Sequence, residues 1–108
     1  MTTYVLIESR DPFGSDQVAA NCQLAGDLAG RGHTAVLYLI ENGVFAARRA
    51  AQQDHLQRAA AAGVQILADD FSLKERGMDI AELSDHVSAS PLEAVLDHLV
   101  AGSRVMWH

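Results

Sequence analysis

Apolar residues along this chain form short unbroken runs and, between the runs, stretches in which they recur every three or four positions. The runs combine β-branched, aromatic and leucine side chains and so place apolar groups on both faces of an extended chain. Such runs are typical of strands covered on both sides, as in a parallel sheet. We therefore predict three buried strands, at residues 4–7, 34–40 and 64–67.

A helical spacing follows the first strand. Ser15 is a plausible N-cap, and the glycines at residues 30–32 end the pattern. The apolar positions that share one face of this helix are Val18, Cys22, Ala25 and Ala29, with Leu24 and Leu28 widening the stripe.

The second strand is followed by an alanine-rich stretch with high helix propensity. It predicts one long helix over residues 44–62, with Gly63 in the position that glycine favours after a helix end. Beyond the third strand, Asp79 and Glu82 have the spacing of a capping box for a short helix. Residues 86–89 predict a brief fourth strand.

The last part of the chain opens with a strong helix signal. Ser90 is placed as the cap, Pro91 at the first helical position and Glu93 at the third, which predicts a helix to about residue 101. Residues 103–108 predict a final strand. Strands alternate with helices over short connections, so the expected fold is a three-layer α/β/α sandwich, flavodoxin-like, with a mostly parallel five-stranded sheet in a single domain, residues 1–108.

Composition narrows the class of protein. The 108 residues are 49% hydrophobic, and 8 Lys and Arg stand against 14 Asp and Glu, a net charge of −6 with no basic stripe. We therefore expect no nucleic-acid partner. No apolar stretch approaches the roughly 20 residues of a membrane span, and the N-terminal run is unlike a signal sequence, so we expect no membrane association and a cytoplasmic location. Cys22, the only cysteine, also suits a reducing compartment.

Polar side chains follow the strands at their carboxyl ends, where such folds bind ligands. The candidate rim residues are Glu8, Arg10, Glu41, Asn42, Asp69, Asp70 and, a little further on, Arg76. Four carboxylates on one rim raise the hypothesis of a divalent-cation site, because hard oxygen ligands suit Mg²⁺ or Ca²⁺. A solvated rim is the plainer interpretation, and the only lysine, Lys74, is not at the end of the last strand, where a phosphoacceptor site would need one. We assign no metal and no cofactor.

Cys22 is the only residue of this chain that could carry sulfur chemistry. Its neighbours at helical spacing are apolar or small, and it lies about two turns into its helix, beyond the reach of the helix dipole. A small core residue is therefore the favoured interpretation.

Four segments together resemble one family. They are YVLIESRDPFGSDQ, AGDLAGRGHTAVLYLIENGVFAARR, GVQILADDFSLKERGM and GSRVMWH, and in this order and spacing the chain resembles the DsrE/DsrF family of small sulfur-relay proteins, the DsrE and TusD type in particular. The resemblance implies a flavodoxin-like fold and assembly into homo- or hetero-oligomers. In active members it also implies a cysteine just past the third strand that carries sulfane sulfur as a persulfide.

The position that corresponds to this cysteine holds Asp69. A carboxylate cannot form the S–S bond of a persulfide, so relay chemistry cannot occur there. Three hypotheses stay open. The chain is a non-transferring, oligomer-forming partner or regulatory subunit of sulfur metabolism, which we prefer, or a sulfurtransferase that uses Cys22, or a domain that binds a small ligand or divalent metal at the acidic rim.

Overall fold

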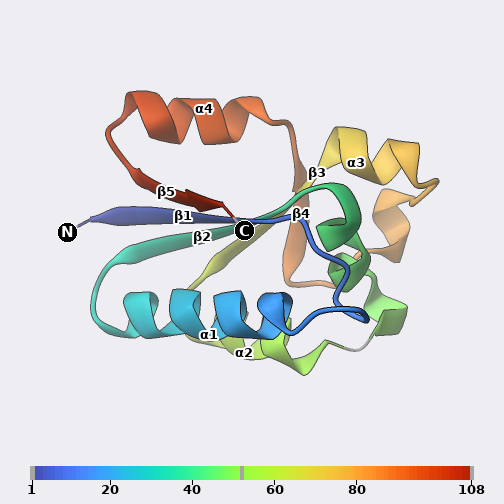
Figure 1. The fold of residues 1–108 in the computed structure, drawn as a ribbon, viewed down its shortest axis with the longest axis horizontal. Coiled ribbons are helices and arrows are strands. Elements are labelled where there is room, and N and C mark those ends of the chain that lie inside the picture. Colours follow the sequence, from blue (N-terminus) through green and yellow to red (C-terminus); the bar gives the residue numbers. More distant parts are fainter. Residues whose placement is uncertain (1, 52, 108) are drawn as a thin grey trace.

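The computed structural model describes residues 2–51 and 53–107, and within them five strands form one parallel sheet in the order β4–β3–β2–β1–β5. The strands are β1 (Thr3–Glu8), β2 (Thr34–Leu39), β3 (Gln65–Asp69), β4 (Val87–Ser90) and β5 (Arg104–Trp107). β1 is paired on both sides, with Val5 opposite Val36 of β2 and Val105 of β5. The predicted α/β sandwich with a parallel five-stranded sheet is confirmed (Figure 1).

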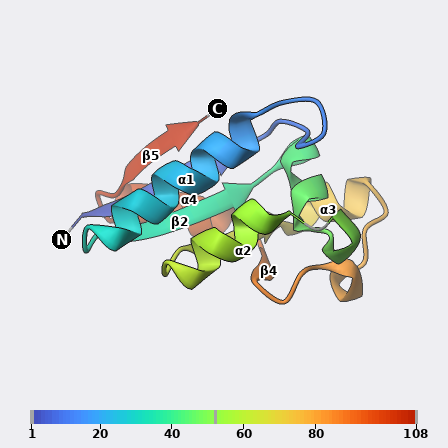
Figure 2. The ribbon, with the colours of Figure 1, turned by 90° about the horizontal axis from the view of Figure 1, so that it is seen from below.

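The helices cover the two faces of the sheet unequally. α1 (Gln17–Gly30) and α2 (Asp54–Ala61) lie side by side on one face, as Figure 2 shows, and α4 (Glu93–Val100) lies on the other. The sheet order explains this, because the steps from β1 to β2 and from β2 to β3 run in one direction and the step from β4 to β5 runs in the opposite one. Right-handed crossovers then place α4 on the face opposite α1 and α2.

Shorter elements gather beyond the strand ends. They are η1 (Glu41–Ala47), η2 (Arg49–Ala51), α3 (Asp70–Glu75) and η3 (Ile80–Glu82), where η marks a 3₁₀ turn. In Figure 1 they lie to the right, past the carboxyl ends of β1, β2 and β3. We call this side of the sheet the carboxyl edge.

Successive side chains of each strand point to opposite faces of the sheet, so the core has two parts. Leu6 and Leu37 face α1 and α2, while Val5 and Ile7 belong to a second cluster that Val95 of α4 completes. All five side chains are buried. The interpretation of these runs as strands covered on both faces is therefore confirmed. In the part of the chain that the structure describes, no helix is long and apolar enough to cross a membrane.

The predicted long helix over residues 44–62 is wrong. The chain forms the two 3₁₀ turns η1 and η2 first, and of the residues described in this stretch only Asp54–Ala61 are α-helical. Arg48 is extended, with φ −68° and ψ 130°, because it pairs with Leu83 in an antiparallel bridge. The backbone N–H of Ser84 also donates to the carbonyl of Ala47, at 2.8 Å. Pairing with a distant segment has overridden the helix propensity of the alanines.

Two predicted helix caps are also wrong. The residue before α1 is Asp16, and the Ser15 hydroxyl accepts instead from the N–H of Gln17 at 3.1 Å. Ser90 belongs to β4, where it lies opposite Asp69, and its hydroxyl donates to the carbonyl of Pro91. Sheet pairing extends one residue further than the sequence pattern predicts, so Ser90 is no longer available as a cap for α4.

Other local predictions are confirmed. Asp79 and Glu82 form the capping box, with the Asp79 N–H 2.7 Å from a Glu82 carboxylate oxygen, although the turn that they cap is 3₁₀. Gly63 follows α2 with φ +102°, a conformation that suits glycine. The last strand is Arg104–Trp107, and residue 108 of the prediction lies outside the described residues.

Candidate functional site

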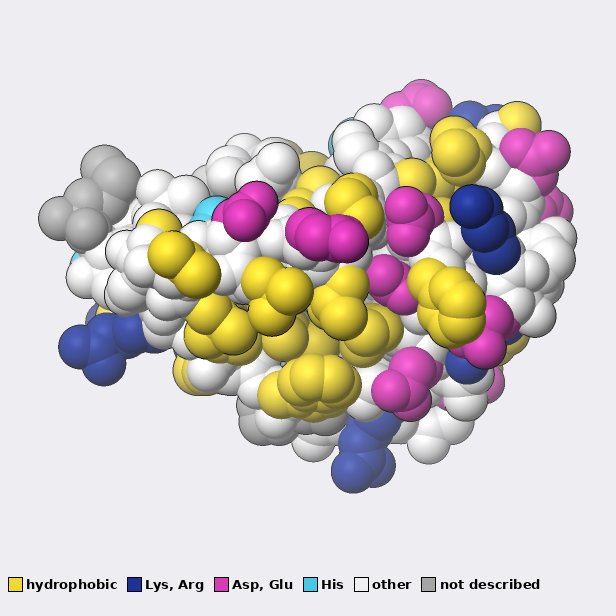
Figure 3. All heavy atoms as spheres, turned by 90° about the horizontal axis from the view of Figure 1, so that it is seen from above, with side chains coloured by type: hydrophobic (Ala, Val, Ile, Leu, Met, Phe, Trp, Pro, Cys, Tyr) yellow, Lys and Arg dark blue, Asp and Glu magenta, His cyan; other side chains and the backbone are white. Residues whose placement is uncertain are grey.

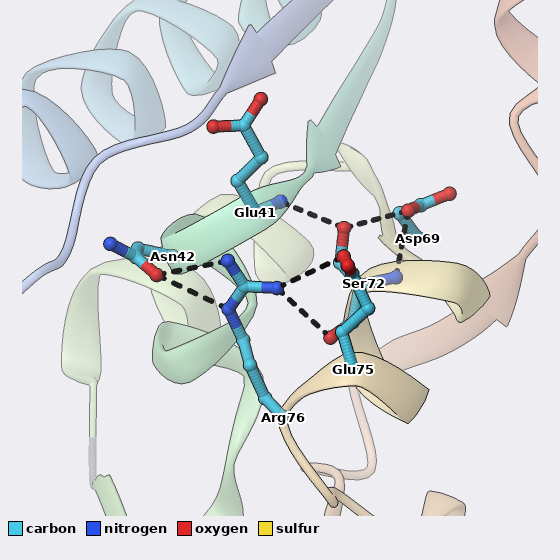
Figure 4. A network of polar contacts seen from close by, with 6 residues as sticks. All are labelled: Glu41, Asn42, Asp69, Ser72, Glu75 and Arg76. Carbon is cyan, nitrogen blue, oxygen red and sulfur yellow. Dashed lines mark hydrogen bonds and ion pairs between the residues drawn. The ribbon is translucent and has the colours of Figure 1, made fainter.

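Asp69 ends β3 at the carboxyl edge and is the N-cap of α3. Its side chain is buried, with 3% of the residue exposed, and its carboxylate accepts three hydrogen bonds. One oxygen accepts from the Tyr38 hydroxyl at 2.8 Å. The other accepts from the Ser72 N–H at 2.9 Å and from the Ser72 hydroxyl at 2.7 Å (Figure 4). The carboxylate is therefore held by the protein itself and faces no open site.

Ser72 connects α3 to the end of β2. Its hydroxyl donates to Asp69 and accepts from the backbone N–H of Glu41 at 2.8 Å. Glu41 has φ +53°, and among the described residues it is the one non-glycine residue with positive φ. The chain thus turns sharply after β2, and the serine hydroxyl stabilises that turn by satisfying its N–H group.

Arg76 holds the same turn from the other side. Its guanidinium donates through two nitrogens to the side-chain oxygen of Asn42, at 3.2 and 3.1 Å, and through the third to the carbonyl of Ser72 at 3.3 Å. An ion pair of 3.5 Å joins it to Glu75, and it lies 5.9 Å from the centre of the Phe45 ring. Figure 4 shows Arg76 reaching from α3 towards Asn42 and Ser72. Through these contacts Arg76 connects the end of α3 to η1.

Glu8 lies apart from this network. It is fully buried at the end of β1, where its carboxylate accepts from the Asn21 side-chain amide and from the Arg10 N–H, each at 2.9 Å. η1 crosses directly over it, because a Cβ added at Gly43 would overlap the Glu8 carbonyl oxygen. Glu8 is therefore a buried link between β1 and α1, and it is closed off from the surface.

The structure thus brings together only part of the predicted rim. Glu41, Asn42, Asp69 and Arg76 share one network, whereas Glu8 bonds to α1 and Arg10 contributes its backbone to Glu8. Asp70, half-buried, occupies the first turn of α3. Within residues 2–51 and 53–107, no three His, Cys, Asp or Glu side chains are close enough to hold a metal ion.

Two ionisable side chains of the core have shifted pKa values. Burial, together with the nearby Glu8 charge, raises the pKa of the Cys22 thiol to about 12. Burial also raises the pKa of Tyr38 far above its usual range, and the hydrogen bond to Asp69 and the charge of that carboxylate add to the shift. Both groups stay protonated at neutral pH. Cys22 is 3% exposed, so its thiol is neither accessible nor ionised.

Several residues of these networks are absent from the sequence-based candidates, among them Tyr38, Ser72 and Asn21. Tyr38 lies in an apolar run that predicts a buried strand. Because a buried tyrosine hydroxyl needs a hydrogen-bond partner, the sequence could have indicated a polar contact at Tyr38. The Asp69–Ser72 spacing is that of a helix cap and its third residue, a second usable signal. The hydrogen bond between Asn21 and Glu8 depends on how α1 packs on the sheet, so no local sequence pattern predicts it.

The chain has a DsrE-like, flavodoxin-like α/β fold. The YchN protein of E. coli, which has this fold, superposes with a TM-score of 0.89 at 20% identity over the full length of both chains. MTH1491 from Methanobacterium thermoautotrophicum, a protein of unknown function, gives 0.77 at 19% identity, also over both full chains.

A third structure of the same fold is BT1422 from Bacteroides thetaiotaomicron, a conserved protein of unknown function. It gives a TM-score of 0.78 at 14% identity over 98% of this chain and 94% of its own. No family model and no curated protein matches the sequence. At these identities the likeness establishes the fold and carries no activity with it.

Proposed function

We propose that this chain is a DsrE-like subunit of sulfur metabolism that transfers no sulfur itself and acts as a partner or regulatory component by assembling with other subunits. The observation that carries the proposal is the state of Asp69. The end of β3, where the resemblance implies a persulfide-carrying cysteine, holds a carboxylate with both oxygens committed to Tyr38 and Ser72. This network fixes the start of α3.

Cys22 offers no substitute. Sulfur transfer needs a thiolate that a partner's sulfur can reach, and this thiol is buried against the sheet with a pKa of about 12. Desolvation favours its neutral form, and the Glu8 carboxylate adds to that preference. These properties support the interpretation of Cys22 as a core residue.

An exposed apolar face supports the assembly part of the proposal. Figure 3, viewed from the α4 side, shows a band of hydrophobic side chains bordered by acidic ones. Large apolar side chains that remain exposed on α4, just before it and on β5 are Leu92, Leu96, Leu99, Val100 and Trp107, which we call the α4 face. Leu96 and Leu99 are each about half exposed, at 52% and 51%. An apolar group of this size on a small domain is typical of an interface.

The proposed inability of this chain to carry sulfur is tested by mass spectrometry. The protein and a Cys22→Ala variant are incubated with a polysulfide donor, and their intact masses are compared. We expect no sulfur adduct on either protein under native conditions, and an adduct on the unmutated protein only after unfolding in urea. A native adduct that disappears in Cys22→Ala would contradict the proposal and favour a relocated sulfurtransferase.

The assembly part is tested by light scattering after size-exclusion chromatography at micromolar concentration. We expect an oligomer that Leu96→Glu dissociates and that Leu24→Glu leaves intact, because Leu24 lies on α1 at the opposite side of the sheet. Since the chain carries a net charge of −6 and acids border the α4 face, self-association should strengthen at higher ionic strength. A monomer at every concentration and salt would reject self-assembly on this face.

A further inference from the structure

A cavity of about 380 Å³ lies where α2 begins, away from the Asp69 network. Its walls come from the segment between η1 and η2, from the first turns of α2 and from the loop before β4. The polar lining includes Arg48, Arg49, Gln53, Asp54 and His86. The cavity exists because residues 47–49 pair with residues 83–84 in place of continuing a helix.

Arg48, in the lining of the cavity, has a side-chain donor without an acceptor in the described part of the chain. Its Nε is buried, and among the described residues no hydrogen-bond partner accepts from it. The guanidinium carbon lies 5.6 Å from the centre of the Phe45 ring, a cation–π contact that leaves the Nε–H donor without an acceptor. A buried donor without an acceptor costs about 1–3 kcal/mol, which favours the entry of an acceptor into this cavity.

Further donors line the same cavity. Arg49 donates to the carbonyl of Leu83 at 3.1 Å, and its exposed contact with Asp85, at 3.4 Å, is a weak surface pair. His86 also lines the cavity and can donate through a ring N–H. Gln53, just before α2, makes no side-chain cap, so its side chain does not occupy the first N–H groups of this helix.

We infer that this cavity binds the phosphoryl group of a small phosphorylated molecule. The Arg48 fork donates to two phosphate oxygens, Arg49 supplies further positive charge, and a ring N–H of His86 and the backbone at the start of α2 supply further donors. The volume lies within the usual range for small-molecule sites, about 300–1,000 Å³, and leaves room for the rest of the molecule. The Asp54 carboxylate, on one wall of the cavity, repels the phosphate. It is suited to accept from a hydroxyl or ammonium group elsewhere in the bound molecule.

This inference does not depend on the proposed function. It uses none of the residues that hold Asp69 and none of the α4 face. A failure of either proposal therefore leaves the other standing.

The test is a titration followed by ¹⁵N–¹H NMR at fixed ionic strength, with inorganic phosphate, glycerol phosphate and acetate as separate probes. We expect saturable shifts around Arg48 and the start of α2 with both phosphates, and much weaker ones with acetate. Tighter binding of glycerol phosphate supports a phosphorylated molecule as the ligand, and equal binding supports free phosphate as sufficient.

Variants test the geometry of the site. Arg48→Met should weaken phosphate binding about tenfold or more, and Arg48→Lys should recover part of the loss, because it keeps the charge without the fork. Asp54→Asn should bind more tightly than the unmutated protein, a gain that partial unfolding cannot mimic. Arg31→Met, which changes an exposed arginine after α1, is the matched control and should bind normally.

Several results would overturn the inference. They are the absence of saturable shifts with either phosphate, binding that Arg48→Met leaves unchanged, and an equal loss in Arg31→Met. The last of these would mean that an arginine anywhere on the surface attracts phosphate equally well, with no site at Arg48.

Discussion

Replacement of Asp69 is the most direct perturbation of the carboxyl edge. Asp69→Ala removes the acceptor of three hydrogen bonds at once, from the Tyr38 hydroxyl, the Ser72 N–H and the Ser72 hydroxyl. Asp69→Asn keeps one oxygen for the two Ser72 donors. Its amide can donate to the Tyr38 oxygen, while the Tyr38 hydroxyl keeps its second acceptor, the Ser90 carbonyl at 3.2 Å. The two variants should therefore differ clearly in stability.

The size of the effect follows from these contacts. Loss of a helix N-cap costs about 1 kcal/mol, and loss of a buried bond to a charged acceptor costs about 1.5–3 kcal/mol. Because Tyr38 keeps its bond to Ser90, we expect Asp69→Ala to lower the free energy of unfolding by about 2–4 kcal/mol. Asparagine is as good a cap as aspartate, so Asp69→Asn should lower it by only about 1 kcal/mol.

Urea unfolding followed by circular dichroism measures both values. Asp79→Ala is the control, since it removes an exposed cap of a 3₁₀ turn and should cost less than Asp69→Ala. If Asp69→Ala unfolds within about 0.5 kcal/mol of the unmutated protein, the carboxylate does not hold the edge together. If the asparagine variant is as unstable as the alanine variant, charge and not hydrogen bonding explains the role of Asp69.

Three further outcomes are expected. Gly43→Ala should lower the free energy of unfolding by about 1–3 kcal/mol in the same assay, because its Cβ would meet the Glu8 carbonyl oxygen; an unchanged midpoint would mean that η1 moves aside easily. Cys22 should resist iodoacetamide at pH 8 and react fully in urea, since its pKa is about 12 in the fold; rapid native labelling would show an open route to the thiol. Glu41→Gly should raise the melting temperature by a few degrees, because φ +53° strains a residue with a Cβ; a lower melting temperature would mean that the Glu41 side chain stabilises the turn.

The sequence predicts the fold well because its strands are buried on both faces. Runs such as residues 34–40 need no knowledge of their neighbours to be interpreted as strands, and Gly63 marks a helix end by its own conformational freedom. The helix over residues 44–62 fails for the opposite reason. Its alanines favour a helix locally, and only the pairing of Arg48 with Leu83, 35 positions away, extends the chain there.

The site is less predictable than the fold. Position at a strand end draws attention to Asp69 and Asn42, but it cannot tell an exposed rim from a buried one. Glu8 is buried because η1 folds back across the end of β1, which is a property of the assembled edge. Charge in a sequence is thus a poor guide to exposure wherever a later segment can cover a strand end.

The sheet order also governs how the chain can be assembled during synthesis. β2, β3 and β4 are added one after another on one side of β1, while the other side of β1 receives β5, whose residues are made more than 90 positions later. Until Arg104–Trp107 leave the ribosome, the hydrogen-bonding groups of one edge of β1 have no strand partner, and Val5 and Ile7 lack the cover of α4. A nascent chain of this protein therefore carries an open, apolar sheet edge until β5 has been made, and in that form it is exposed to mispairing and to chaperones.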